Sequence, residues 1–240
     1  MDPLSNPHRV HPFLLIGLYE AEEIFKKLDP GFRVFHIDIV TTGNSTSNYV
    51  AETDMGRFFL KLYPETNSLC GNELAAYRYA SGLIRAPKVL WSEYRPGGVS
   101  HAILEYIEGA MTLEEYVREN KTFSEDVAFQ IGAMLSLLHS RSYPGRGRLD
   151  KNLELSEPLP TLCGQILSYL DGTAGEWLGE ACRERLRAFF NDHKDALDEE
   201  AGSPVFSHGD FIPNNVLVDD NKTVWFIDFE RCTANPRYCD

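Results

Sequence analysis

Apolar and polar residues alternate along most of the first part of the chain, in the pattern of half-buried β-strands. Five stretches carry this pattern: residues 33–43, 48–53, 57–64, 87–94 and 100–109. Asp54–Gly56 forms a turn between the second stretch and the third, and Arg95–Gly98 forms one between the last two. Helical spacing occurs at residues 68–83 and, ahead of the strands, at residues 12–28. We therefore expect a β-rich region with one inserted helix, up to about Gly109.

After Gly109 the apolar residues recur at helical spacing instead. Within residues 124–140 this spacing is carried by Val127, Ile131, Met134, Leu135 and Leu138. The predicted helices are residues 112–120, 124–140, 161–172 and 176–200, and residues 142–160 are predicted to be a loop. Strand character returns in residues 204–209, 215–218 and 223–229. The pattern predicts an α+β protein: an N-terminal helical segment (1–30), a small β-rich lobe (31–108) and a mainly helical lobe (109–240) with a late polar hairpin.

The composition fits an ordinary globular protein, with 43% hydrophobic and 25% charged residues. A formal net charge of −13 argues against nucleic-acid binding and fits either plain solubility or a cationic partner. The five cysteines form no Cys-x-x-Cys pair, so a reducing compartment is favoured over a disulfide framework or zinc site. The apolar run near the N-terminus is too short to span a bilayer and lacks a signal-peptide cleavage pattern. We expect a cytoplasmic protein without a membrane partner, and the sequence leaves its oligomeric state open.

Three polar side chains stand at the ends of the late strand-like runs. Asp210 follows residues 204–209, Asn215 comes five residues later, and Asp228 ends the next apolar run. Pairing of the last two strands brings Asn215 and Asp228 together at the open end of a hairpin. Amide and carboxylate oxygens are ligands that Mg²⁺ prefers, which leaves Asp210 to accept a hydrogen bond from an attacking hydroxyl. Taken singly, these are common turn residues, and His208 beside them suits a structural role.

The stretch HGDFIPNN (residues 208–215), followed by WFIDFE (residues 225–230), resembles the aminoglycoside phosphotransferase and choline kinase family. In that family His-Gly-Asp stands where protein kinases have His-Arg-Asp. The resemblance implies a protein-kinase-like two-lobe fold, with a small antiparallel β-sheet lobe and a larger helical lobe. It also implies ATP, or GTP, as co-substrate, Asp210 as the catalytic residue, and Asn215 and Asp228 as ligands of Mg²⁺.

A kinase also needs a lysine on a strand of the small lobe and a helical glutamate that orients it. Lys61 is the single lysine in the apolar strand 57–64, where an unpaired ammonium would be costly to bury. Glu73 lies on the next predicted helix. Because the polar hairpin occurs in the same chain, we predict an ion pair that binds the nucleotide phosphates. The alternative is a strand lysine in water and an exposed glutamate.

Two further segments carry weaker signals. The connection between the first two strands offers backbone amides and three hydroxyls to a triphosphate: those of Ser45, Thr46 and Ser47. This connection lacks the G-x-G-x-x-G pattern, so a simple turn is nearly as consistent with it. The resemblance places the main chain of Glu105 and Ile107 opposite the adenine base, with Tyr106 between them. A strand that ends in a turn at Gly109 is the alternative.

The acceptor is expected to be a hydroxyl group of a small, cationic molecule. Residues 114–205 contain seventeen acidic and ten basic residues, and family members that modify cationic antibiotics bind them on acidic surfaces of the helical lobe. An aminoglycoside-type antibiotic is the first expectation. Choline, ethanolamine, a sugar or an amino alcohol is the alternative, and an inactive nucleotide-binding protein is the third possibility. The resemblance runs from about Phe35 to Asp240, where family members continue into further helices, so we expect a chain shortened at its C-terminus.

Overall fold

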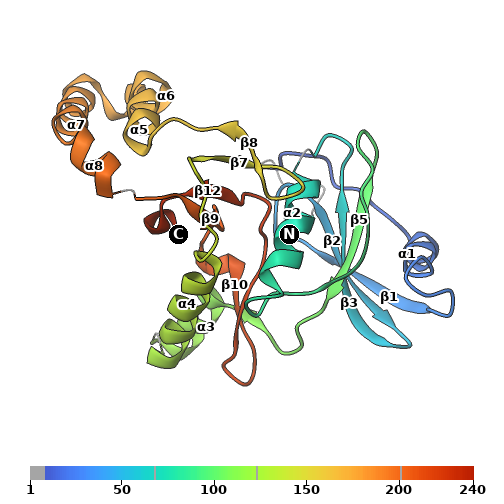
Figure 1. The fold of residues 1–240 in the computed structure, drawn as a ribbon. Coiled ribbons are helices and arrows are strands. Elements are labelled where there is room, and N and C mark those ends of the chain that lie inside the picture. The colour runs from blue at the N-terminus through green and yellow to red at the C-terminus, as the bar shows by residue number, and fades with distance from the viewer. Residues whose placement is uncertain (1–8, 68, 123, 201) are drawn as a thin grey trace.

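The computed structural model describes residues 9–67, 69–122, 124–200 and 202–240 (Figure 1). Residues 1–8 of the predicted N-terminal segment lie outside the described residues, as does Ser68 at the start of the predicted helix 68–83. An antiparallel sheet forms one end of the molecule, and a group of helices from the second half of the chain forms the other (Figure 1). Short strands and longer helices lie between these two ends.

The large sheet is antiparallel throughout, with the strand order β1-β2-β3-β5-β4. Its strands are β1 (Val34–Val40), β2 (Ser47–Thr53), β3 (Gly56–Tyr63), β4 (Val89–Glu93) and β5 (Ser100–Glu105), which confirms the five predicted strands. In β3, Lys61 stands between the fully buried Leu60 and Leu62. Because successive side chains of a strand point to opposite faces, Lys61 leaves the sheet on the face away from these two leucines.

Helix α1 covers Leu18–Phe25, so the predicted helix 12–28 is wrong over its first residues. Residues 12–17 are not helical, and this segment binds β2, since the Leu14 amide donates to the Ser47 hydroxyl at 2.8 Å. A periodic apolar pattern does not distinguish this strand-side packing from a helix that begins earlier.

Helix α2 (Cys70–Ala80) lies between the large sheet and the rest of the molecule (Figure 1). Its apolar face joins the main core through Leu74, Ala76, Tyr77 and Ala80. Glu73 is fully buried on the same helix, at 0% exposure. A buried carboxylate requires a partner, so the position of α2 already indicates where the polar centre of the protein lies.

Helices α3 (Leu113–Asn120) and α4 (Glu125–Leu138) confirm two of the predicted helices. The predicted polar hairpin is also present. Its strands β10 (Val216–Val218) and β11 (Val224–Phe226) pair antiparallel, and β6 (Met111–Thr112) pairs with the other edge of β10. The hairpin packs into the same core as α2 and α4 through Val216, Val218, Val224 and Phe226.

The predicted loop 142–160 is wrong in part, because it contains two short strands. These are β7 (Gly147–Leu149) and β8 (Leu155–Pro158). With β9 (Val205–Ser207) and β12 (Thr233–Asn235) they form a four-stranded sheet in the order β8-β7-β12-β9. Strands of three or four residues are too short to show a period of two, so the sequence pattern does not reveal them.

The predicted helix 161–172 is confirmed as α5 (Leu162–Asp171), but the predicted helix 176–200 is three shorter helices. They are α6 (Thr173–Leu178), α7 (Glu180–Asp192) and α8 (Lys194–Glu200). Gly179 separates the first two, because its φ of 76° is incompatible with a right-handed helix. None of the helices in the described ranges is long and apolar enough to cross a membrane.

Candidate active site

The backbones of Asn215 and Asp228 meet at one end of the β10–β11 hairpin. Asn215 ends a short 3₁₀ helix directly before β10, and Asp228 follows two residues after β11. Val216 pairs with Phe226, and the Ile227 amide donates to the Asn215 carbonyl at 3.0 Å. The turn spacing in the sequence therefore predicts the observed register.

Asp210 is held next to Asn215 by the asparagine side chain. The Asn215 amide nitrogen Nδ2 donates to the Asp210 carbonyl at 2.8 Å and to carboxylate oxygen Oδ2 at 3.3 Å. These bonds use the donor end of the asparagine and leave its amide oxygen as a possible ligand. Gly209 precedes this loop with a φ of 78°, and a Cβ atom there would overlap the Arg231 carbonyl, so glycine is required.

Asp240 binds the segment that leads into Asp210. Its fully buried carboxylate accepts hydrogen bonds at 2.7–3.0 Å from the Ser207 hydroxyl, the His208 and Gly209 amides, and His139 Nε2. Burial alone would raise the pKa of Asp240, but these donors hold it below its ordinary value.

The His208 ring has a structural role. It donates through Nε2 to the Ile227 carbonyl at 2.9 Å. Burial lowers the pKa of His208, which agrees with a neutral imidazole.

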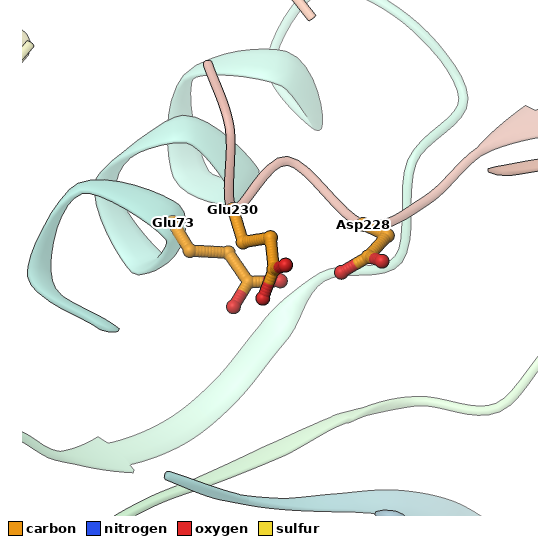
Figure 2. Close-up of side chains that lie close together, drawn as sticks. All are labelled: Glu73, Asp228 and Glu230. Carbon is orange, nitrogen blue, oxygen red and sulfur yellow. The ribbon is translucent and has the colours of Figure 1, made fainter. Parts of the chain in front are cut away.

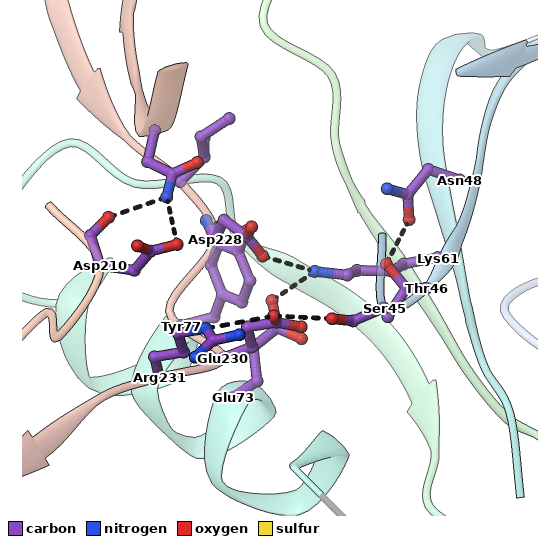
Figure 3. A network of polar contacts seen from close by, with 12 residues as sticks. Ser45, Thr46, Asn48, Lys61, Glu73, Tyr77, Asp210, Asp228, Glu230 and Arg231 are labelled. Carbon is purple, nitrogen blue, oxygen red and sulfur yellow. Dashed lines mark hydrogen bonds and ion pairs between the residues drawn. The ribbon is translucent and has the colours of Figure 1, made fainter. Parts of the chain in front are cut away.

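Lys61, Glu73 and Asp228 form the charged centre of the site (Figure 3). Lys61 Nζ lies 2.5 Å from Glu73 Oε1 and 3.0 Å from Asp228 Oδ1. Burial would lower the pKa of Lys61, but the Asp228 and Glu73 carboxylates raise it well above its ordinary value. Burial would likewise raise the pKa of Asp228, but Lys61 holds it below the usual range. Lys61 and Asp228 are therefore both ionised at neutral pH.

Glu230 adds a third carboxylate to this centre. Oxygen atoms of Glu73, Asp228 and Glu230 lie within 4.8 Å of one another, and Figure 2 shows the three side chains converging. Burial raises the pKa of Glu73 to about 7, although Lys61 lowers it. Burial also raises the pKa of Glu230, and the charge of Asp228 adds to this effect. Glu73 Oε2 is buried and has no hydrogen-bond partner among the described residues. The centre thus carries more negative charge than Lys61 alone can balance.

The residues at this centre fit a bound Mg²⁺. Asp228 uses Oδ1 to bind Lys61, which leaves its Oδ2 as a possible ligand. Asn215 uses its amide nitrogen to bind Asp210, which leaves its amide oxygen as a second possible ligand. Carboxylate and amide oxygens are the ligands that Mg²⁺ takes in nucleotide sites. The surplus negative charge also favours a divalent cation.

The three predicted phosphate-binding hydroxyls make different contacts. The Ser45 hydroxyl donates to Glu230 Oε1 at 3.0 Å, which joins the β1–β2 connection to the acidic centre (Figure 3). The Thr46 hydroxyl donates to Asn48 at 3.0 Å. The Ser47 hydroxyl is fully buried and accepts from the Leu14 amide, so it faces the N-terminal segment and is not available to a phosphate. Ser45 is therefore the predicted hydroxyl that reaches the centre.

The predicted adenine-binding segment leads out of β5. The Glu105 amide donates to the Lys88 carbonyl at 3.0 Å, which ties this segment to the residue before β4. The Arg57 guanidinium lies over the Tyr106 ring, with its central carbon 4.7 Å from the ring centroid. The Ile107 amide has no hydrogen-bond partner among the residues that the structure describes, so it is a donor available to a ligand.

The sequence did not single out three residues of the candidate active site: Tyr77, Glu230 and Asp240. Helical spacing could have indicated Tyr77, which lies one turn after Glu73 on the same face of α2. Glu230 follows Asp228 by two residues, a spacing that keeps both near the same strand end. Nothing local indicates Asp240, because its partners lie at least 31 residues away along the chain.

A small antiparallel sheet with a buried lysine–glutamate pair, joined to a helical part with an acidic hairpin, is the arrangement of a protein-kinase-like protein. A model of the phosphotransferase enzyme family (APH) matches residues 36–240, and the chain belongs to this family. No curated protein matches the sequence significantly.

Solved structures show the same fold at low sequence identity. A thermostable mutant of aminoglycoside phosphotransferase APH(4)-Ia, in ternary complex with AMP-PNP and hygromycin B, has a TM-score of 0.65 at 14% identity, over 91% of this chain and 73% of that one. The streptomycin–ATP–APH(2")-IIa complex has a TM-score of 0.58 at 17% identity, over 95% and 75%. Choline kinase LicA from Streptococcus pneumoniae has a TM-score of 0.55 at 17% identity, over 91% and 71%. Each likeness establishes the fold.

Proposed function

We propose that this protein transfers the γ-phosphoryl group of ATP, or GTP, to a hydroxyl group of a small cationic molecule. The observation that carries the proposal is the buried contact of Lys61 with both Glu73 and Asp228, in a chain of the phosphotransferase enzyme family. A buried lysine with two carboxylate partners is held in one position and stays charged, as the binding of phosphate oxygens requires.

The nucleotide is bound by residues from both sides of the centre. The Lys61 ammonium contacts the α- and β-phosphates, and Glu73 fixes its position. Ser45 turns from Glu230 toward the phosphates. The Glu105 carbonyl and the Ile107 amide bind the base, with Tyr106 between them. Asn215 and Asp228 hold Mg²⁺, with Glu230 beside them. The metal ion supplies positive charge that neutralises the phosphate oxygens.

Asp210 orients the acceptor hydroxyl and takes its proton. Its Oδ2 atom faces the Asn215 amide, so Oδ1 is the oxygen free to bind the hydroxyl. As the acceptor oxygen bonds to the γ-phosphorus, the bond from phosphorus to the β–γ bridging oxygen breaks and ADP leaves. The acceptor proton passes to Asp210 late in this process, because the transition state is loose. Positioning and electrostatics therefore account for most of the catalysis.

We propose an aminoglycoside-type antibiotic as the acceptor. Solved structures of the same fold include complexes with hygromycin B and with streptomycin, and the acidic excess of residues 114–205 suits a cationic acceptor. Choline kinase LicA also shares the fold, so choline, ethanolamine, a sugar or an amino alcohol is the second candidate. All five cysteines are free, which supports the cytoplasm, where such acceptors meet ATP.

A coupled assay of nucleotide turnover tests this function. Purified protein is incubated with Mg²⁺ and either ATP or GTP, across a panel of aminoglycosides, macrolides, choline, ethanolamine and sugars. Acceptor-dependent formation of ADP or GDP, with a phosphorylated product by mass spectrometry, supports the proposal and identifies the acceptor class. Nucleotide-dependent thermal stabilisation without turnover on any acceptor would instead identify an inactive nucleotide-binding protein.

A further inference from the structure

Tyr77 connects helix α2 to the metal-binding end of the hairpin. It lies four residues after Glu73, so both side chains leave α2 on the same face. Tyr77 is 5% exposed, and its ring packs edge-on against Phe229, with centroids 5.2 Å apart and an interplanar angle of 78°. This contact fixes the ring between the helix and the residue that follows Asp228.

The Tyr77 hydroxyl binds the backbone of Asp228. The Asp228 amide donates to Tyr77 Oη at 2.8 Å, and Figure 3 shows Tyr77 beside Asp228. Asp228 has a φ of 65°, a left-handed conformation that residues other than glycine seldom adopt and that neighbouring structure must maintain. The preceding residue is fixed at both of its peptide groups, since the Ile227 amide donates to Asn215 and its carbonyl accepts from His208.

We propose that Tyr77 is a positioning residue for Asp228. Its hydroxyl holds the left-handed backbone that aims the Asp228 carboxylate at Lys61 and at the metal position. Because Glu73 lies on the same face of α2, this one helix sets the place of Glu73 directly and of Asp228 through Tyr77. The inference rests on the proposed function, since it assigns Tyr77 a part in binding the metal–nucleotide complex.

The physical reason lies in the hydrogen bond that the Asp228 amide makes to the buried Tyr77 side chain. Replacement of Tyr77 by phenylalanine keeps the ring contact with Phe229 and removes the acceptor of this amide. A partly buried donor without an acceptor is unfavourable, so the backbone at Asp228 then relaxes toward other conformations. A carboxylate that is distributed over several positions binds a metal ion more weakly than one held in place.

Tyr143→Phe is a matched control for Tyr77→Phe. Tyr143 is 7% exposed, and its hydroxyl makes one buried hydrogen bond, to the Leu153 carbonyl at 3.1 Å. Each variant loses one hydrogen bond of a buried tyrosine, and the Leu153 carbonyl keeps its bond from Arg141. We therefore expect Tyr143→Phe to lose no more thermal stability than Tyr77→Phe. Only Tyr77→Phe should change metal binding, because Tyr143 contacts no residue of the charged centre in the described structure.

The experiment is a Mg²⁺ titration at saturating ATP, read by nucleotide-dependent thermal stabilisation and by initial rate. We expect Tyr77→Phe to raise the half-saturating Mg²⁺ concentration about three- to tenfold, the ratio that corresponds to one hydrogen bond. ATP binding without metal should match the wild type, and Tyr143→Phe should match the wild-type Mg²⁺ dependence. Equal half-saturation in Tyr77→Phe and Tyr143→Phe would overturn the inference.

Amide hydrogen exchange tests the contact independently of any ligand. The ¹⁵N-labelled Asp228 amide should be protected in the wild-type protein and exchange faster in Tyr77→Phe. An unprotected Asp228 amide in the wild type overturns the inference even if the variant proves too unstable to titrate. Lack of any Mg²⁺-dependent nucleotide binding in the wild type, with this amide protected, overturns the proposed function instead and removes the metal-binding role of Tyr77 with it.

Discussion

Replacement of Lys61 by methionine removes the positive charge that contacts both Glu73 and Asp228 and retains the length of its buried stem. In the wild type, Lys61 Nζ contacts Glu73 and Asp228, and the lysine side chain is 5% exposed. Without it, three carboxylates lie within 4.8 Å of one another, and the remaining cation beside them is the exposed Arg231, 3.9 Å from Glu230. Breaking a buried ion pair by removing one partner costs about 3–5 kcal/mol in the free energy of unfolding.

This loss should depend on pH. Burial raises the pKa of Glu73 to about 7 against the opposing effect of Lys61, so removal of Lys61 raises this pKa further. Glu73 in the variant relieves part of the repulsion by staying protonated, and we expect a larger loss near pH 8 than near pH 6. For a protein of this size, about 3–5 kcal/mol lowers the Tm by roughly 6–20 °C.

Urea unfolding and thermal melts at both pH values measure the effect. Lys26→Met is the matched control, because Lys26 pairs with Glu22 and Glu23 on the surface of α1. Exposed ion pairs contribute little, so the control should unfold close to the wild-type midpoint. A Lys61→Met protein that unfolds at the wild-type urea midpoint near pH 8 would refute the buried ion-pair network.

Three further predictions concern other parts of the molecule. Asp240→Ala leaves several buried donors without an acceptor and should lower the free energy of unfolding by about 3 kcal/mol or more, measured by urea denaturation. The pKa of Glu73 is higher folded than unfolded, so its contribution to stability is fully present below about pH 4.5 and is lost as the pH rises through about 7. Urea midpoints should therefore fall less over this range in Glu73→Gln than in the wild type, and an unchanged slope would contradict that pKa. A thiol reagent should modify Cys182 and Cys239 in the native protein and the three buried cysteines only after unfolding.

The sequence predicts the parts of the site that depend on local pattern. Lys61 is recognisable because a lone lysine in an apolar strand must find a partner, and the pairing with Glu73 follows from their placement on adjacent elements. The hairpin register that brings Asn215 and Asp228 together follows from the length of one turn. The five strands of the large sheet are likewise predicted, because each is long enough to show its period.

The remaining features depend on contacts between distant residues. Ser47 belongs by sequence to the candidate phosphate loop, but a hydrogen bond from Leu14 commits its hydroxyl elsewhere. Asp240 is an ordinary acidic residue until the fold surrounds its carboxylate with donors from two segments. Helix α7 begins only after Gly179 because of a backbone conformation that the apolar pattern does not record. Pattern therefore predicts elements and pairs of neighbouring elements, while tertiary packing decides which polar groups remain free.

The most direct test of the central claim is acceptor-dependent phosphoryl transfer by Asp210→Asn. The substitution keeps the size of the side chain and removes the carboxylate proposed to orient the hydroxyl and take its proton. Asp220→Asn, at an exposed position in the turn of the same hairpin, is the matched control. We predict that Asp210→Asn lowers turnover by at least roughly 100-fold, with nucleotide-dependent thermal stabilisation close to the wild type, while Asp220→Asn retains full turnover. Wild-type phosphoryl transfer by Asp210→Asn would contradict the proposed mechanism.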